Sequence, residues 1–292
     1  MWALPMSAFG LRLGEEGDAS ADLRILLGPA GPPSLPLAYE RRAAQALHPT
    51  STVYSNGQVW LERFHHLASQ PAFAIDPGAR TITVYPDAAP ADVVEHHLFD
   101  HVVPSTLQLL GRLCFHASAV AFERGVVAFA APSGTGKSTL AAFLSKSRSL
   151  FSDDALAIEL VDGRVLALPG APGNRLRADS ARAIAGTEPT TVVAGKARVR
   201  RAVADSALRL VALCCLERVG PDEAPRLDRR SALETLPDLL QQIHRLAGED
   251  RGVLEREMTQ LMDVLAVVPT YRLRLPAAFD RLPEVEHLLT QL

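Results

Sequence analysis

The sequence has little of what would cross-link the chain or anchor it in a membrane. It has three cysteines, an odd number, and they lie in apolar runs without metal-ligand spacing: Cys114, Cys214 and Cys215. This pattern excludes a disulfide framework and predicts reduced thiols. No stretch reaches the roughly 18 apolar residues of a membrane span, and no secretory signal begins the chain. We therefore expect a cytoplasmic protein with no membrane partner.

The chain also lacks an excess of basic charge. Its formal net charge is −3 and its basic residues are scattered. This balance predicts no nucleic-acid or anionic-membrane surface. Internal repeats and low-complexity tails are missing too. Hydrophobic residues make up 48% of the 292 positions, enough for a substantial core in one large domain or two domains.

A Gly-rich stretch stands between an expected strand and an expected helix. Residues 131–138 read Ala-Pro-Ser-Gly-Thr-Gly-Lys-Ser, a match to the phosphate-binding-loop pattern with Ala in place of the first Gly. The apolar run 126–130 predicts a strand buried on both faces, and residues 139–144 favour a helix. Such a turn points backbone N–H groups and the positive end of a helix dipole into one hollow.

That hollow suits a nucleoside triphosphate, and we expect ATP and Mg²⁺ to bind there. Lys137 would reach the β- and γ-phosphates, and the Ser138 hydroxyl would reach the Mg²⁺. A Gly-rich turn that binds nothing is the alternative. The candidate nucleotide-binding residues are Ser133, Gly134, Thr135, Gly136, Lys137, Ser138 and Thr139.

A pair of acidic residues, Asp153 and Asp154, follows the short apolar stretch Leu150-Phe151. The spacing from the loop fits a right-handed strand–helix–strand crossover, which would bring the pair to the loop's edge of the sheet. Both carboxylates would then face the phosphates. One could hold Mg²⁺ and the other could accept a proton from an incoming hydroxyl. The alternative is a solvated acid pair in a turn.

Residues 1–88 predict a small β-rich N-terminal domain. Strands are expected at 9–13 and 23–27, and 28–36 is expected to be a loop. Asn56-Gly57 predicts a hairpin turn within residues 52–61, and Asp76-Pro77-Gly78 predicts another within 72–85. No catalytic motif occurs there, so a partner-binding or scaffold role is the default expectation.

The remaining residues, 89–292, form the expected catalytic domain, which begins with a helical stretch at 90–111 bent near Pro104. His96, His97 and His101 lie on this stretch, and His97 and His101 have the spacing of two ligands on one helix face. Because neither a third ligand nor a companion acid is evident, we expect ordinary half-buried histidines and no structural metal.

A strand is expected at 113–122, and Glu123-Arg124-Gly125 is too short for anything but an antiparallel return into the loop strand. The sheet must therefore be mixed. His116 lies on this neighbouring strand, where it could be a packed core residue or a functional one. Further scaffold elements are expected at 208–216, 236–246, 254–265, 267–275 and 284–291.

Residues 115–120, 131–138 and 151–154 together resemble, in order and spacing, the core of the HPr kinase/phosphorylase family and its shorter relatives. More remotely they look like the nucleotide site of phosphoenolpyruvate carboxykinase. The resemblance covers about residues 112–275. It implies an α/β, mixed-sheet phosphate-loop (Walker A) core and transfer of the ATP γ-phosphate to a serine hydroxyl.

The resemblance also implies individual roles. His116 matches a family histidine near the phosphates, and the acidic pair matches a base and a metal ligand, with Asp153 as the base and Asp154 on Mg²⁺ beside Ser138. The family's Gly-containing signature after the acidic pair has no counterpart here, which argues against HPr as the substrate. Residues 169–180 instead resemble the shorter relatives, some of which phosphorylate peptide precursors.

Three cations complete the candidate site. Arg175 and Arg177 could clamp phosphate or a substrate carboxylate, and Lys196 could add positive charge. Solvated surface cations are the alternative for each of them.

We therefore expect an ATP-dependent serine kinase whose partner is a peptide or small protein, with a homo-oligomer possible. A small-molecule kinase and a non-catalytic ATP-binding regulator remain open. A GTPase is disfavoured because the chain has no Asn-Lys-x-Asp guanine signature.

Overall fold

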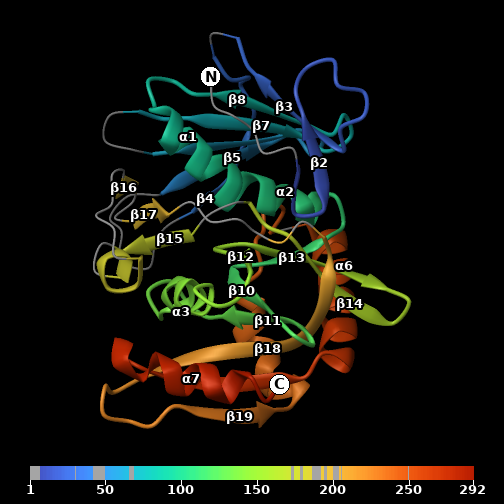
Figure 1. Ribbon diagram of the computed structural model, residues 1–292. Coiled ribbons are helices and arrows are strands. Elements are labelled where there is room, and N and C mark those ends of the chain that lie inside the picture. The colour runs from blue at the N-terminus through green and yellow to red at the C-terminus, as the bar shows by residue number, and fades with distance from the viewer. Residues whose placement is uncertain are drawn as a thin grey trace.

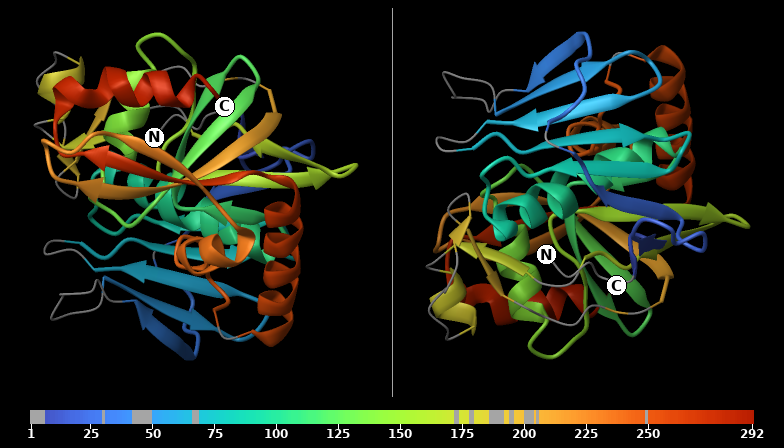
Figure 2. Two further views of the ribbon diagram at one scale, coloured as in Figure 1. Left: turned by 90° about the horizontal axis from the view of Figure 1, so that it is seen from below. Right: turned by 90° about the horizontal axis from the view of Figure 1, so that it is seen from above.

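The computed structural model describes residues 7–29, 31–41, 50–65, 69–171, 174–177, 180–185, 192–193, 196–199, 204, 206–248 and 250–292. The fold is mixed α/β with mixed sheets (Figure 1). A helical segment lies between a sheet formed by residues 7–85 and a larger sheet formed by later residues, as both views of Figure 2 show. Among the described residues, no helix combines the length and apolar composition needed to cross a bilayer.

The first sheet has the strand order β1-β2-β3-β8-β7-β6-β5-β4. The predicted hairpin at Asn56-Gly57 is confirmed, because the Asn56 side chain accepts hydrogen bonds from the Gln58 and Val59 amides at 3.0 and 2.8 Å. The predicted strand 9–13 begins too early: Phe9 and Gly10 turn at φ 55° and 69°, and the strand itself starts at Leu11. The strands are β1 Ser7–Ala8, β2 Leu11–Gly14, β3 Leu23–Leu27, β4 Leu37–Arg41, β5 Ser51–Ser55, β6 Trp60–Phe64, β7 Ala72–Asp76 and β8 Thr81–Tyr85.

The helical segment consists of α1 (Ala91–His97), the π-helix η1 (Leu98–Val102) and α2 (Val103–Leu109). A helix at 90–111 was predicted, but its irregularity is a widened turn before Pro104. Proline has no N–H to donate back along a helix, and the wider turn directly before it accommodates that loss.

One face of this segment shares a hydrophobic core with both sheets. Val94, Phe99 and Val102 pack in one cluster with residues of β3, β7 and β8. The same cluster includes Cys114, Ala157 and Leu168 from the second sheet. The division of the chain at residue 88 stays a prediction, and this core continues across it.

The second sheet has the order β12-β10-β11-β18-β14-β13-β9, with β20 also paired to β18 and β19 paired to β20. The predicted antiparallel return from β10 into β11 is confirmed, while β11–β18 and β18–β20 are parallel. The strands are β9 Leu113–Phe115, β10 Ala117–Phe122, β11 Gly125–Ala130, β12 Leu150–Ser152, β13 Leu156–Val161, β14 Arg164–Leu168, β18 Leu208–Val219, β19 Arg226–Arg230 and β20 Thr270–Pro276.

The predicted single strand 113–122 is wrong, because it breaks at His116. Before the break β9 pairs with β13, and after it β10 pairs with β11 and β12. The chain thus changes partner strands at this residue, and the His116 backbone does not take part in the pairing of either strand. Its N–H donates instead to the Gln242 carbonyl at 2.5 Å.

Helices cover both faces of the second sheet. The face that carries α3 (Lys137–Leu144) and α7 (Leu282–Leu289) is opposite the face that carries α5 (Ala232–Leu240) and α6 (Arg251–Val267). The predicted helix over 236–246 is too long. The observed helix α5 ends at Leu240, whose carbonyl accepts a hydrogen bond from the Arg245 guanidinium at 2.8 Å. Ile243 and Leu246 lie in the irregular segment that follows.

Among the smaller elements, β15 and the π-helix η2 contact α3. Strands β15 (Asn174–Arg177), β16 (Val192–Val193) and β17 (Lys196–Val199) form a small sheet in the order β15-β17-β16. The π-helix η2 (Ala181–Ala185) and the 3-10 turn η3 (Phe279–Arg281) complete the described elements.

The three cysteines are buried and free, as predicted, and burial raises the pKa of each thiol, for Cys215 to about 11.

Candidate functional site

Four strands of the second sheet end at the same edge. Because β10 is antiparallel to both β11 and β12, these two run in the same direction, as do β18 and β20. The carboxyl ends of parallel strands are the usual place for ligand sites in α/β folds. A cavity of about 510 Å³ lies at this edge, lined by residues at the ends of all four strands or just after them.

The loop after β11 and the start of α3 form one wall of the cavity. The predicted nucleotide-binding residues that line it are Ser133, Gly134, Gly136, Lys137, Ser138 and Thr139. Thr135 instead donates its hydroxyl to the Pro132 carbonyl at 2.9 Å.

Gly134 and Gly136 adopt φ values of 88° and 116°, a region that side chains disfavour. The N-cap residue of α3 is Gly136, which has no side chain to cap the first N–H groups of the helix; such a helix start suits an anion. Loop and helix together form a concave set of backbone donors.

Lys137 is 4% exposed, and its ammonium lies against the loop. The Nζ atom donates to the carbonyl of Ala131 at 2.5 Å and of Pro132 at 3.3 Å. Lys137 also lines the cavity, so its ammonium lies at the wall that the loop forms.

The acidic pair follows β12, and the two carboxylates have different surroundings. Asp154 is 6% exposed and lines the cavity opposite Ser138 and Lys137. Asp153 accepts a hydrogen bond from the Ser118 hydroxyl at 2.6 Å and does not line the cavity. Asp154 therefore lies in the cavity wall, and Asp153 directly precedes it in the chain; their roles stay predictions.

Two histidines contact the backbone of the acidic pair. The Nδ1 atom of His116 lies 3.0 Å from the Asp154 carbonyl, and the Nε2 atom of His244 lies 3.4 Å from the same oxygen. A carbonyl only accepts, so His116 Nδ1 carries the proton and the neutral ring has its lone pair on Nε2. Asp154 has φ 62°, an uncommon value outside glycine, and these rings help to hold it there.

The sequence did not point to His244. It lies in the irregular chain after α5, its N–H donates to the Cys114 carbonyl at 2.8 Å, and its ring packs edge-on to His116 at 5.9 Å. Arg218, at the end of β18, was likewise missed as a cavity residue. Ser180 was missed too, although its hydroxyl lies 3.0 Å from that of Thr139. In the sequence, only the position of Arg218 near the carboxyl end of a predicted strand could have indicated that it lies at the cavity.

The three predicted substrate cations lie in the small sheet, where Arg177 of β15 pairs in register with Lys196 of β17. Arg175 lies two residues earlier on β15. The side chains of all three lie outside the described part of the structure, so their proposed contacts stay predictions.

Comparison with known proteins gives little beyond this geometry. No protein-family model matches the chain, and no curated protein matches it. Among solved structures, the HPr(Ser) kinase/phosphatase from Coxiella burnetii is similar over 61% of this chain and 94% of that one, with 11% identity and a TM-score of 0.33. A likeness this weak carries no argument about activity.

Proposed function

We propose that the protein is an ATP-dependent kinase that transfers the γ-phosphate to a serine hydroxyl of a peptide or small protein. One observation carries the proposal: the cavity brings the Gly-rich loop, the start of α3, Lys137, Ser138 and Asp154 together at one edge of the sheet. Backbone donors, an ammonium, a hydroxyl and a carboxylate are the groups that phosphoryl transfer uses.

The residues present fit ATP and Mg²⁺. A volume of about 510 Å³ lies within the range of pockets that hold small ligands and cofactors. Ser138 and Asp154 both line it and offer oxygen ligands, the type that Mg²⁺ prefers. When bound, Mg²⁺ would neutralise charge on the β- and γ-phosphates.

The chain's own residues would share the remaining work. Lys137 would bind the transferring phosphoryl group. Asp153, which directly precedes the cavity residue Asp154 and is hydrogen-bonded by Ser118, would accept the proton of the acceptor hydroxyl, a role that rests on the sequence resemblance. The serine oxygen bonds to the γ-phosphorus as the bond from that phosphorus to the bridging oxygen breaks and ADP leaves. His116 would position the acidic turn through the Asp154 carbonyl.

The reduced thiols support a cytoplasmic setting for this reaction. A peptide acceptor rests on the sequence resemblance, as does the choice of serine.

Calorimetry with Mg²⁺-ATP tests the nucleotide site. Lys137→Ala should weaken affinity at least tenfold, since the loop loses the cation that reaches the phosphates. Lys146→Ala is the matched control, because Lys146 is exposed just beyond α3 and does not line the cavity. Equal affinity in all three proteins would mean that the loop is a structural turn.

A transfer assay tests the reaction separately. Labelled ATP is offered with a library of serine-containing peptides, with the same library carrying alanine for serine, and with free serine. Label on the first library alone supports the proposal. Label on free serine alone would make the protein a small-molecule kinase, and tight ATP binding with no transfer to any acceptor would favour a regulator.

A further inference from the structure

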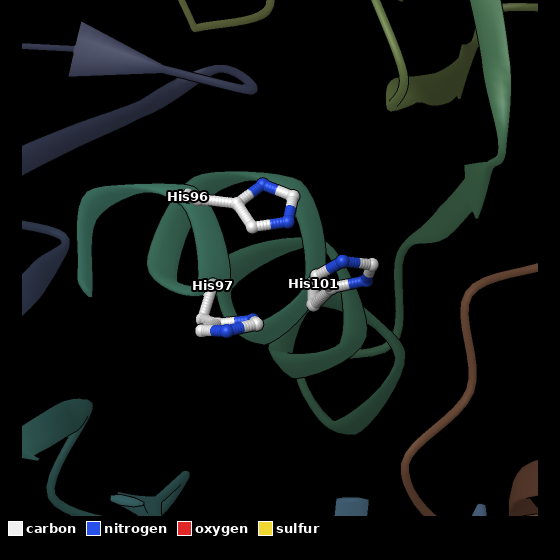
Figure 3. Close-up of side chains that lie close together, drawn as sticks. All are labelled: His96, His97 and His101. Atoms are coloured by element: carbon white, nitrogen blue, oxygen red, sulfur yellow. The ribbon is translucent and has the colours of Figure 1, made fainter. Parts of the chain in front are cut away.

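Three histidines of the helical segment form a compact group. Figure 3 shows His96 and His97, at the end of α1, beside His101 of η1. One potential ligand nitrogen from each lies within 4.8 Å of the other two. The sequence-based expectation that no third ligand is available was wrong, because His96 joins the predicted pair.

The π-helix explains why the third ligand escapes a helical reading of the sequence. In a regular α-helix, residues five apart point roughly 140° away from each other around the axis. The π-helix Leu98–Val102 begins between these two histidines, and its wider turns rotate less per residue, so His101 lies closer to the side of His96 than in a regular helix. Their ring centroids are 5.3 Å apart, and those of His97 and His101 are 5.9 Å apart.

Neighbouring groups orient the rings. The carboxylate of Asp100 lies 2.8 Å from His96 Nδ1, an arrangement that places the lone pair of the neutral ring on Nε2. A carboxylate behind the imidazole is the usual outer partner of a metal-binding histidine. The ring of Phe64, from β6, stacks on His97 at 3.9 Å and an interplanar angle of 17°.

We propose that His96, His97 and His101 bind one divalent transition-metal ion of the Zn²⁺ class. Imidazole nitrogen suits Zn²⁺ and its first-row neighbours, whereas Mg²⁺ prefers oxygen. With Zn–N bonds of about 2.0–2.1 Å, tetrahedral ligands lie about 3.3 Å apart, so modest side-chain rotations would close the group around the ion. Three protein ligands leave one position for water or another oxygen ligand. This site is distinct from the proposed Mg²⁺ site and does not rest on the kinase assignment.

Metal titration of the full chain, without a polyhistidine tag and with excess Mg²⁺ present, tests the proposal. Calorimetry should find one equivalent of Zn²⁺, and Co²⁺ should give the intense visible absorption of tetrahedral coordination. His101→Gln should weaken Zn²⁺ binding at least ~100-fold because one of three ligands is lost. Asp100→Asn should weaken it ~10–100-fold through the outer partner.

His287→Gln is the matched control, an exposed histidine on α7 outside the group. It should bind Zn²⁺ and Co²⁺ as the unaltered chain does. Circular dichroism shows whether each variant is folded, and the exposure of His101 makes its replacement the least disruptive. Absence of stoichiometric Zn²⁺ binding in the unaltered chain, or equal binding in a folded His101→Gln variant, would overturn the proposal.

Discussion

Gly170, just after β14, contacts Ser152 at the end of β12, directly before the acidic pair, and this contact provides a test of the geometry. A Cβ added at Gly170 would lie within 3.0 Å of both the Oγ and the Cβ of Ser152, closer than real Cβ atoms approach such neighbours. The hydroxyl cannot rotate away without cost, because it donates to the Ala155 carbonyl. The chain cannot shift freely either, since the Gly170 N–H donates to the Phe151 carbonyl at 3.0 Å. Gly170→Ala should therefore strain the turn.

The magnitude follows from these contacts. Overpacking a buried site costs about 1–3 kcal/mol, and loss of the serine hydrogen bond costs about 1 kcal/mol more. Alanine also reduces the conformational entropy of the unfolded chain, which stabilises the folded state by about 0.4–1 kcal/mol. The expected net loss is about 2 kcal/mol, which for a chain of this size lowers the melting temperature by roughly 3 °C.

A double-mutant cycle measures the contact directly. Denaturant unfolding is compared for the unaltered chain, Gly170→Ala, Ser152→Gly and the double variant. Because Ser152→Gly removes both clashing atoms, the double variant should be at least about 1 kcal/mol more stable than the sum of the single effects. Gly248→Ala is the control, since a Cβ there meets no atom within 4 Å.

Two results would refute the reasoning. If Gly170→Ala is as stable as the unaltered chain, the two residues do not touch. If the effects are simply additive, the strain lies elsewhere, and the turn that positions Asp154 is not built as described.

Three further predictions concern the cavity. Asp154→Asn should chiefly raise the Mg²⁺ concentration needed for turnover, whereas Asp153→Asn should cut turnover ~10²–10⁴-fold, as expected for a lost base. Steady-state kinetics over a range of Mg²⁺ concentrations separates the two effects. Unchanged turnover in both variants would exclude a catalytic role for this pair. His116→Gln should lower turnover at least ~10-fold with little change in melting temperature, whereas a purely packed histidine would cost stability of about 1–2 kcal/mol and leave turnover intact. Arg218→Gln should weaken ATP binding roughly 2–5-fold at low salt and leave it unchanged at high salt, because an exposed cation is screened; a salt-independent loss would point to a structural role.

The sequence predicted the local parts of the site well. The strand before the loop, the helix after it and the tight return at residues 123–125 each follow from neighbouring residues. Glycine at φ 88° and 116° and an apolar run before the turn are local requirements, so a local pattern can reveal them.

Features that depend on distant partners could not be predicted in this way. The break at His116 arises because β9 and β10 pair with different strands, and no residue near it signals the exchange. The end of α5 is set in part by the Arg245 guanidinium, from beyond the helix. His244 reaches Asp154 only because that irregular chain crosses the acidic turn.

The π turn shows a second reason why the sequence alone did not predict the histidine group. Helical periodicity assumes a constant rotation per residue, and a single widened turn shifts every later side chain around the axis. His96 and His101 therefore look unrelated in the sequence although they lie side by side. Two histidines five residues apart, just before a helix proline, can therefore share one side of the helix, as histidines four apart do in a regular helix.

The hydrophobic core that joins the two sheets limits how the chain could be divided or recombined. Val94, Phe99 and Val102 would lose their apolar cover if the first sheet were replaced by an unrelated module. An expressed fragment of residues 89–292 would expose this face, and exposed apolar patches of that kind cause association. Gene fusions that exchange the first 88 residues should therefore succeed only when the incoming sheet matches the shape of this helical face.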